Sequence, residues 1–297
     1  MKRLIPITLA ALLLTGCGSP VNATPSVGPS QIKLPIVSSG QMPKYKRVVA
    51  LADGSAEIVA SLGFKEYLVG RDIASTMPEL KNIPVDTDAH QVSVERVLTQ
   101  KPDLILIDSN TSPTSALNTL KQTGIKIVSI PSSFSLANIP VKEAAIANAL
   151  GVMKAANLLK KDLVSATFAP SQTKVVFLYL RGTASIYLVG GKGSGADSIL
   201  EKIGVRDVGA ENLKTPFTAL SAEALIKMNP DVILLMTKGL DSVGGISGLV
   251  SLPGIAQTSA GKRRAIVTVD DSLLLSFGPR TAPMLPLLRN AIDKVAK

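Results

Sequence analysis

The feature that most constrains the fold of this chain is a short pattern that occurs twice. A serine is followed two residues later by a glutamate, and then by a Pro-Asp pair and an apolar run at the same distance in both copies. The first copy comprises Ser93, Glu95, Pro102, Asp103 and the run LILID, and the second comprises Ser221, Glu223, Pro230, Asp231 and the run VILLM. Each copy predicts a short helix that leads into a buried strand.

A second pair of matching segments supports the repeat. GSAEIVASLGF begins at Gly54 and GADSILEKIGV begins at Gly195, and both are typical of a glycine turn, an amphipathic helix and a glycine stop. The two features follow the same order in each half of the chain. One α/β unit used twice, and therefore a protein of two similar lobes, is the simplest explanation.

The apolar runs predict four strands in each lobe. They are 48–51, 67–70, 104–108 and 126–130 in the first lobe, and 174–180, 186–189, 232–236 and 265–269 in the second. Because they alternate with helices, we expect an α/β fold of two Rossmann-like lobes with mostly parallel sheets. Ligands of such sheets bind beyond the carboxyl ends of the strands, which predicts a ligand cleft between the lobes.

Helical periodicity without an internal proline runs from about 140 to 168, between the two halves. A single helix of this length would reach roughly 40 Å and would join the lobes as a rigid rod. The predicted boundaries are therefore an N-terminal lobe over 46–139, a connecting helix over 140–168 and a C-terminal lobe over 169–297.

The N-terminus has the features of an export signal. Lys2 and Arg3 precede a short apolar stretch, and the sequence LTGC ends at Cys17. Residues 1–16 are predicted to be a signal peptide, and LTGC resembles the lipobox of bacterial lipoproteins, in which the cysteine is lipidated. The alternative is an ordinary signal peptide with a chance cysteine. Residues 17–45, rich in Ser, Pro, Gly and Thr, are predicted to be a flexible tether.

These signals place the protein outside the cytoplasm, on the outer face of the cell membrane or in the periplasm if the cell has an outer membrane. Cys17 is the only cysteine, which excludes an internal disulfide and a thiol metal site. The net charge is +10. No dense Lys/Arg block with interleaved aromatics occurs, so nucleic-acid binding is not expected. The charge serves either solubility or attraction to an anionic ligand or membrane.

Enzyme motifs are incomplete. The cluster Gly190–Gly195 lacks the Ser or Thr that a P-loop needs after Gly-Lys, because Gly193 stands there. Ser259 and Lys262 have the spacing of penicillin-recognising enzymes without their companion motifs. With one histidine in the chain, a multi-histidine metal site is excluded. A binding protein is therefore favoured over an exported chelatase or hydrolase, or over an adhesin with an empty cleft.

Tyr179 and Arg181 end the predicted strand KVVFLYLRG. Residues two apart on a strand point to the same face, so phenol and guanidinium emerge together at the cleft. The cation favours the ionised phenol, which suits ferric iron, and tyrosine is a known axial ligand of haem. The alternative is an edge tyrosine beside a surface arginine. His90, the only histidine, lies in a loop before the helix that Ser93 is predicted to cap; a lone histidine in a loop is usually an exposed polar residue.

From about residue 46 onward, the chain resembles the helical-backbone substrate-binding proteins of ABC importers for haem, siderophores and cobalamin. The resemblance lies in VVALADGSAEIVASLGF, YLVGRD, SVERVLTQKPDLILID, SAEALIKMNPDVILLM and SFGPR. LYLRG, the segment IYLVGGKGSGADSIL after it, and the histidine before the first Ser-x-Glu helix are most similar to haem-binding lipoproteins. The resemblance implies that His90 and Tyr179 bind haem iron from opposite faces, with Arg181 supporting the tyrosine and Tyr187 as the fallback ligand. Several relatives have Tyr-x-Arg in the first loop, whereas Gln91 and Val92 follow His90 here.

The resemblance also implies the roles of charged residues and the partners. Arg71 and Lys192, near predicted strand ends, are candidate contacts for the haem propionates. Glu95 and Glu223 are expected to dock onto arginines of the membrane permease, although a carboxylate in the first turn of a helix is also explained by the helix dipole. The expected partners are haem, the permease and its ATPase subunits, and the expected state is a monomer. A ferric siderophore or cobalamin is the alternative ligand.

Overall fold

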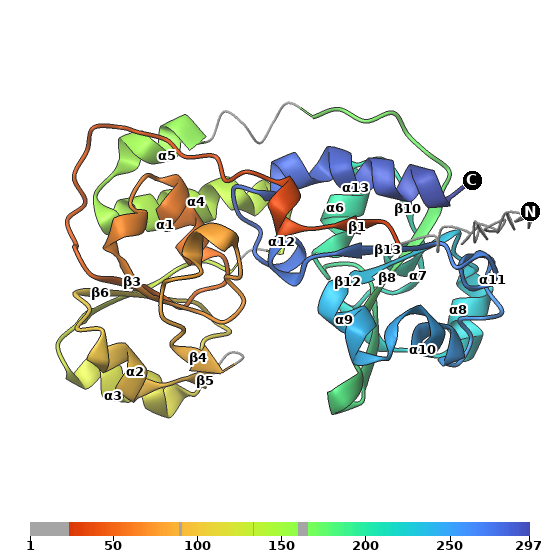
Figure 1. Cartoon of the computed structure of the whole chain (residues 1–297), viewed down its shortest axis with the longest axis horizontal. Coiled ribbons are helices and arrows are strands. Elements are labelled where there is room, and N and C mark those ends of the chain that lie inside the picture. The colour runs from red at the N-terminus through yellow and green to blue at the C-terminus, as the bar shows by residue number, and fades with distance from the viewer. Residues whose placement is uncertain (1–23, 89–90, 133, 160–165) are drawn as a thin grey trace, which may run out of the picture.

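The structure, a computed structural model, describes residues 24–88, 91–132, 134–159 and 166–297. These residues form two α/β lobes that lie side by side along the long axis of the molecule (Figure 1). Short 3₁₀ turns η1 (Pro29–Gln31), η2 (Lys65–Tyr67), η3 (Pro78–Leu80), η4 (Leu136–Asn138) and η5 (Gly182–Ala184) connect some of the elements. Within the described part of the chain, no helix has the length and apolar character needed to span a membrane.

The N-terminal lobe contains a four-stranded parallel sheet in the order β3-β2-β6-β7. Its strands are β2 (Val48–Ala50), β3 (Leu68–Arg71), β6 (Leu104–Ile107) and β7 (Lys126–Ser129). One face is covered by α1 (Ser55–Ser61), α4 (Ile139–Leu150) and α5 (Met153–Leu159), and the other by α2 (Val94–Thr99) and α3 (Thr114–Gln122) (Figure 1). A separate antiparallel pair, β4 (Thr87–Asp88) and β5 (Gln91–Val92), precedes α2.

The C-terminal lobe contains a seven-stranded sheet in the order β1-β13-β12-β8-β9-β11, with β10 also paired to β8. Its strands are β1 (Ser26–Val27), β8 (Lys174–Arg181), β9 (Ile186–Gly190), β10 (Arg206–Asp207), β11 (Phe217–Ala219), β12 (Val232–Met236) and β13 (Ile266–Val269). The helices α6 (Ala196–Lys202), α12 (Asp271–Leu275) and α13 (Thr281–Val295) lie on one face. On the other face lie α7 (Val208–Asn212), α8 (Ala222–Met228), α9 (Thr237–Ser242), α10 (Gly245–Ser251) and α11 (Ser259–Arg263).

All eight predicted strands are confirmed, with ends that agree to within one residue. The buried apolar runs produce this agreement, because each is too short for a helix and is flanked by turn residues. The sheets are mostly parallel, as expected, but β9 runs antiparallel to β8 and to β11. This hairpin at one edge of the C-terminal sheet is the main departure from the predicted pattern.

The sequence repeat has a common structural role in the two lobes. Asp103 accepts hydrogen bonds from the backbone N–H groups of Lys46 (2.7 Å) and Arg47 (2.9 Å), and Asp231 accepts one from the N–H of Lys174 (2.9 Å). In each lobe, the Pro-Asp carboxylate thus ties the start of a central strand to the start of its neighbour. The two central strands are β6 and β12.

The serines of the repeat begin the two helices. Ser93 Oγ accepts a hydrogen bond from the N–H of Arg96, and Ser221 Oγ accepts one from the N–H of Ala224, both at 3.4 Å. Ser93 therefore caps α2 as predicted.

The prediction of a flexible tether through residue 45 is wrong for residues 24–45. β1 pairs in parallel with β13, and the side chains of Val27, Ile32 and Leu34 are buried. Further along, the N–H of Val37 donates to the carbonyl of Ser61. Burial of these few apolar side chains outweighs a composition typical of a linker. Residues 17–23, including Cys17, and the predicted signal peptide lie outside the described residues.

The single connecting helix predicted over 140–168 is also corrected. Helix α4 ends at Leu150, because Gly151 adopts a left-handed conformation (φ 76°), and α5 begins at Met153. Residues 166–173 have no regular structure. Helix α4 itself still joins the lobes, since Ile139 at its start packs in the core of the C-terminal lobe and Ile146 packs in that of the N-terminal lobe.

The segment 276–280, which we call the interlobe segment, connects α12 to α13 and packs against the N-terminal lobe. Arg280 Nη2 lies 3.0 Å from Glu57 Oε2 of α1, and both side chains are 2% exposed. Lys142 of α4, which is also buried, donates through Nζ to the carbonyl of Ser276 (2.9 Å). Buried charged groups on three elements therefore hold the lobes together at this point.

The two glycines of the repeated helix segments explain how the interlobe segment fits. Gly54 and Gly195, which precede α1 and α6, have φ values of 69° and 90°. A Cβ atom at Gly54 would lie 2.5 Å from the carbonyl oxygen of Ser276, and one at Gly195 would lie 2.8 Å from the ring of Phe277. Glycine is needed at both places for backbone conformation and for close approach.

Candidate ligand-binding cleft

A cleft of about 900 Å³ lies between the lobes and is lined by side chains of both. The N-terminal wall includes residues that follow β2, β3 and β6, namely Asp53, Asp72 and Asn110. The C-terminal wall includes residues on or directly after β8, β9, β11, β12 and β13, namely Tyr179, Arg181, Leu188, Phe217, Lys238 and Asp271. This arrangement confirms the expected position of the cleft at the carboxyl ends of the parallel strands.

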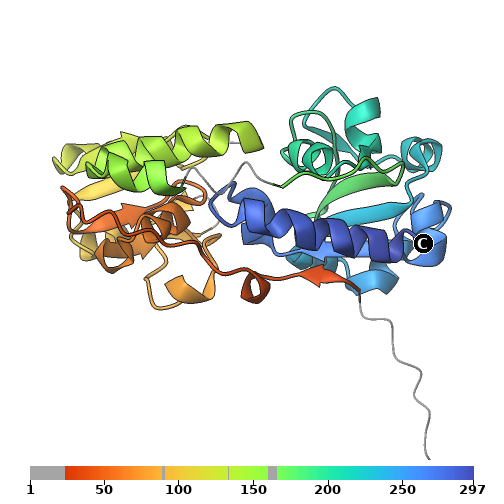
Figure 2. The same cartoon turned by 90° about the horizontal axis from the view of Figure 1, so that it is seen from above.

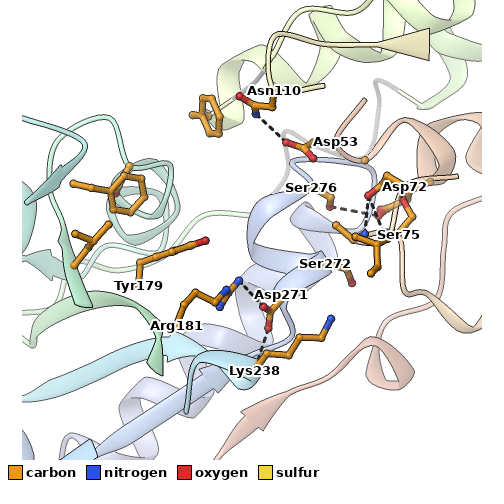
Figure 3. A pocket seen from close by; sticks show the side chains of 18 of the residues that line it. Asp53, Asp72, Ser75, Asn110, Tyr179, Arg181, Lys238, Asp271, Ser272 and Ser276 are labelled. Atoms are coloured by element: carbon orange, nitrogen blue, oxygen red, sulfur yellow. Dashed lines mark hydrogen bonds and ion pairs between the residues drawn. The ribbon is translucent and has the colours of Figure 1, made fainter. Parts of the chain in front are cut away.

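Tyr179 projects into the cleft from β8 (Figure 3). Its ring packs edge-on against Phe217, with ring centroids 5.6 Å apart, and the guanidinium of Arg181 lies 4.8 Å from its centroid. Leu188 of β9 pairs with Tyr179 across the hairpin and also lines the cleft. The phenol oxygen makes no hydrogen bond to any residue that the structure describes, so it is available to a ligand.

Asp271 fixes the position of Arg181. Its Oδ1 accepts a hydrogen bond from Arg181 Nη2, and its Oδ2 accepts one from the backbone N–H of Lys238, both at 3.1 Å. Arg181 also donates to the carbonyl of Leu180 (3.0 Å). The carboxylate therefore links the ends of β8, β12 and β13, and the guanidinium is held over the tyrosine ring rather than free in solvent.

The N-terminal wall is acidic. Asp72 accepts hydrogen bonds from the N–H groups of Ala74 (2.8 Å) and Ser75 (3.1 Å) and from the Ser75 hydroxyl. Burial raises the pKa of Asp72 to about 6, and the charge of Asp53 acts in the same direction. Asp53 accepts a hydrogen bond from Asn110 Nδ2 (3.1 Å). The two walls thus differ in charge, because the opposite wall carries Arg181 and Lys238.

Large apolar side chains in the cleft remain partly exposed. Ile73 is 43% exposed, Phe134 is 46% exposed and Phe217 is 38% exposed. A site with exposed aromatic and aliphatic surface and a few polar groups is typical of small-molecule binding, and exposed apolar surface of this kind is buried when a ligand binds. The cleft suits a ligand with large apolar faces.

Residues 48–273 match the profile of the family described as periplasmic binding protein. The chain belongs to this family.

Similar proteins extend the comparison to nearly the whole chain. The periplasmic heme-binding protein RhuT from Roseiflexus sp. RS-1 is 31% identical, with a TM-score of 0.77, covering 85% of this chain and 99% of RhuT. The heme-binding protein HmuT is 27% identical, with a TM-score of 0.79, covering 91% of this chain and 97% of HmuT. The uncharacterized ABC transporter substrate-binding lipoprotein YvrC of Bacillus subtilis (strain 168) is 27% identical over 294 residues, which cover 92% of this chain and 91% of YvrC.

In this periplasmic binding protein, the other predicted site residues are spread over several environments. The fallback ligand Tyr187 packs against the apolar cluster on the sheet face opposite to Tyr179, and it is not among the residues that line the cleft. Arg71 is buried and donates to the carbonyls of Leu80 (3.2 Å) and Asp72 (3.1 Å), and Lys192 is exposed. Neither of these two cations lines the cleft. The structure therefore brings Tyr179 and Arg181 together in the cleft. The other three predicted residues, Tyr187, Arg71 and Lys192, do not line it.

His90 lies outside the described residues, between β4 and β5. The predicted docking residues Glu95 and Glu223 are exposed, and each occupies the first turn of its helix, α2 or α8. Their equivalent places in the two lobes follow directly from the sequence repeat.

Sequence reasoning did not name Lys238, Asp271 or Phe217 of the C-terminal wall. Lys238 and Asp271 each follow a correctly predicted strand by two residues, so the strand-end rule that selected Tyr179 and Arg181 could have found them. Phe217 belongs to a three-residue strand in a polar stretch, and no local pattern identifies it.

Proposed function

We propose that this chain is an extracytoplasmic haem-binding lipoprotein that captures haem and delivers it to the permease of an ABC importer. The observation that carries the proposal is the Tyr179 phenol in the cleft, with Phe217 against its ring and Arg181 over it. Tyrosine is one of the protein ligands that hold haem iron. A phenolate oxygen is a hard anionic ligand that suits ferric iron.

The shape of the cleft and the relatives support haem as the ligand. Haem has two broad apolar faces, and the exposed side chains of Ile73, Phe134 and Phe217 offer matching surface. HmuT has also been solved with a histidine, a tyrosine or an arginine replaced by alanine, and its replaced tyrosine and arginine are two positions apart. Tyr179 and Arg181 have the same spacing.

His90 is proposed as the second iron ligand. It belongs to the N-terminal lobe, between β4 and β5, whereas Tyr179 belongs to the C-terminal lobe. Ligation from both lobes would bind haem between them, with one ligand on each face of the macrocycle. The propionate contacts first expected at Arg71 and Lys192 are not part of this proposal, because neither residue lines the cleft.

Capture and delivery require no bond chemistry. The exposed Glu95 and Glu223 offer one carboxylate per lobe to a two-fold permease, whose ATPase subunits would drive transport. Lipidation of Cys17 would hold the protein at the membrane surface. Because buried charged groups join the lobes, release is expected to need the permease to separate them. Haem off-rates should therefore rise when the permease complex is added; unchanged release in a system that transports haem would contradict this step.

The test of haem binding is an absorbance titration of the soluble chain, starting after Cys17, with ferric haem. A saturable Soret shift is expected for the wild type. The shift should be altered in Tyr179→Ala and in His90→Ala, whereas Tyr187→Phe, on the other face of the same hairpin, should match the wild type.

Each other outcome has a distinct meaning. Loss only in Tyr179→Ala would remove His90 as a ligand. Loss in Tyr187→Phe with no effect in Tyr179→Ala would overturn the assignment of the tyrosine. The absence of a saturable shift in the wild type would reject haem and favour a ferric siderophore or cobalamin on the same fold.

A further inference from the structure

Charged side chains of both signs line the cleft, and not every cation among them forms an ion pair. Among the described residues that line the cleft, the cations are Arg181, Lys238 and Arg280. Arg181 is paired with Asp271 at 3.1 Å, and Arg280 is paired with Glu57 at 3.0 Å. Lys238 forms no ion pair with any carboxylate in the described part of the chain, and its side chain extends away from Asp271 (Figure 3). Its ammonium group is therefore positive charge that the cleft leaves for a ligand.

The backbone holds Lys238 close to the proposed iron site. β8 and β12 are neighbouring parallel strands, in which Leu178 pairs with Leu235. Residues that follow these strands therefore leave the sheet side by side, about 5 Å apart. Asp271 fixes this junction, since it binds the guanidinium of Arg181 and the N–H of Lys238. The long lysine side chain can then reach a group at the rim of a ligand bound to Tyr179.

The opposite wall disfavours anionic groups. Asp53 and Asp72 line it, and the two carboxyl groups are close enough for the charge of Asp53 to raise the pKa of Asp72. Like charges in a partly desolvated cleft repel, so a carboxylate of the ligand is more stable beside Lys238 than beside these two residues.

We infer that Lys238 binds a propionate carboxylate of haem and, with the acidic wall, orients the propionates toward the C-terminal lobe. This inference rests on the proposed function. Arg181, which is stacked on Tyr179 and paired with Asp271, serves to position the tyrosine. The propionates are the groups that distinguish haem from an esterified or decarboxylated porphyrin, so Lys238 determines specificity for the free diacid.

The experiment compares ferric haem with its dimethyl ester, which keeps the iron and the macrocycle but has no carboxylates. Both are titrated against the wild type, Lys238→Gln and Lys192→Gln in the same solvent. A charge-assisted hydrogen bond to an accessible ammonium should contribute roughly a tenfold difference in affinity. Lys238→Gln should therefore weaken haem binding about tenfold and leave the affinity for the ester unchanged. Lys192→Gln, which changes an exposed lysine outside the cleft, should alter neither.

The outcomes separate this inference from the proposed function. Equal affinity of the wild type and Lys238→Gln for haem, with a normal Soret shift, would overturn the role of Lys238 and leave haem binding intact. The same would follow if Lys192→Gln showed the selective loss. A loss of affinity for haem and ester alike in Lys238→Gln would reveal damage to the fold and also reject the inference. No Soret shift in the wild type would reject the proposed function itself.

Discussion

The ion pair between Glu57 and Arg280 leads to a quantitative prediction about how the two lobes are held together. Glu57 Oε2 accepts a hydrogen bond from Arg280 Nη2 (3.0 Å), and Oε1 accepts one from the N–H of Arg280 (2.8 Å). Both side chains are 2% exposed. Among the residues that the structure describes, the one other side-chain acceptor of this guanidinium is Ser272 Oγ, at 3.2 Å.

Glu57→Gln keeps the size of the side chain but removes its charge. It leaves the arginine buried without a counter-charge, and removing one partner of a buried pair costs about 3–5 kcal/mol of the free energy of unfolding. Thermal unfolding of the ligand-free soluble chain, followed by circular dichroism, should show a decrease in Tm of roughly 10 °C. The double variant Glu57→Met/Arg280→Met should recover much of this loss, because neither charge of this pair is left buried without its partner.

The matched control is Glu211→Gln. Glu211 accepts two hydrogen bonds from Arg206, at 3.0 and 2.8 Å, but both side chains are more than 40% exposed. Water can solvate the remaining arginine, so the Tm of the Glu211→Gln variant should differ little from that of the wild type. If Glu57→Gln and Glu211→Gln shifted Tm by the same small amount, the reasoning from burial would be refuted.

Three further predictions concern other parts of the molecule. Burial raises the pKa of Asp86 to about 6, so its ionisation destabilises the fold as pH rises from about 4 to above 6. The Tm of Asp86→Asn should therefore increase relative to the Tm of the wild type over that pH range. Gly124→Ala should lower the free energy of unfolding by about 1–2 kcal/mol, because alanine is strained at its positive φ. Gly54→Ala should lower it at least twice as much, because the added Cβ also meets a backbone carbonyl. Denaturant unfolding measures both values. The double variant Glu95→Ala/Glu223→Ala should abolish most haem uptake in cells without changing haem affinity; normal uptake would contradict docking.

Much of the fold could be predicted from the sequence because the repeat and the buried apolar runs act locally. Pro102 and Pro230 lie shortly after the ends of α2 and α8, and the aspartates after them precede central strands in both lobes. The parallel order follows from alternation of helix and strand. The β8–β9 hairpin was not foreseen, although the five residues between the two predicted strands, 181–185, are too few for the crossover that parallel strands need.

The predictions for the N-terminal segment and for the connecting helix were wrong for different reasons. Val27, Ile32 and Leu34 are single apolar residues in a polar, proline-rich stretch, and only tertiary contacts show that they are buried. Gly151 lies within a sequence of good helix formers, and it ends α4 by adopting positive φ, as Gly63 and Gly204 do after the repeated helices.

Sequence patterns identified only the part of the site that a single strand supplies. Tyr179 and Arg181 share a face of β8 because side chains alternate along a strand. Lys238, Asp271 and Phe217 join them from three other elements, so their association depends on strand order and on register between strands. A single sequence contains this information only indirectly.

The N-terminal segment has a mechanical consequence for the two lobes. Ile32 packs in the core of the C-terminal lobe and Leu34 in that of the N-terminal lobe, so the chain crosses between the lobes there and again along α4. Figure 2 shows the two crossings on different sides of the molecule. Together with the interlobe segment, these crossings tie the lobes at several separated places, so twisting or sliding of one lobe against the other would stretch at least one attachment.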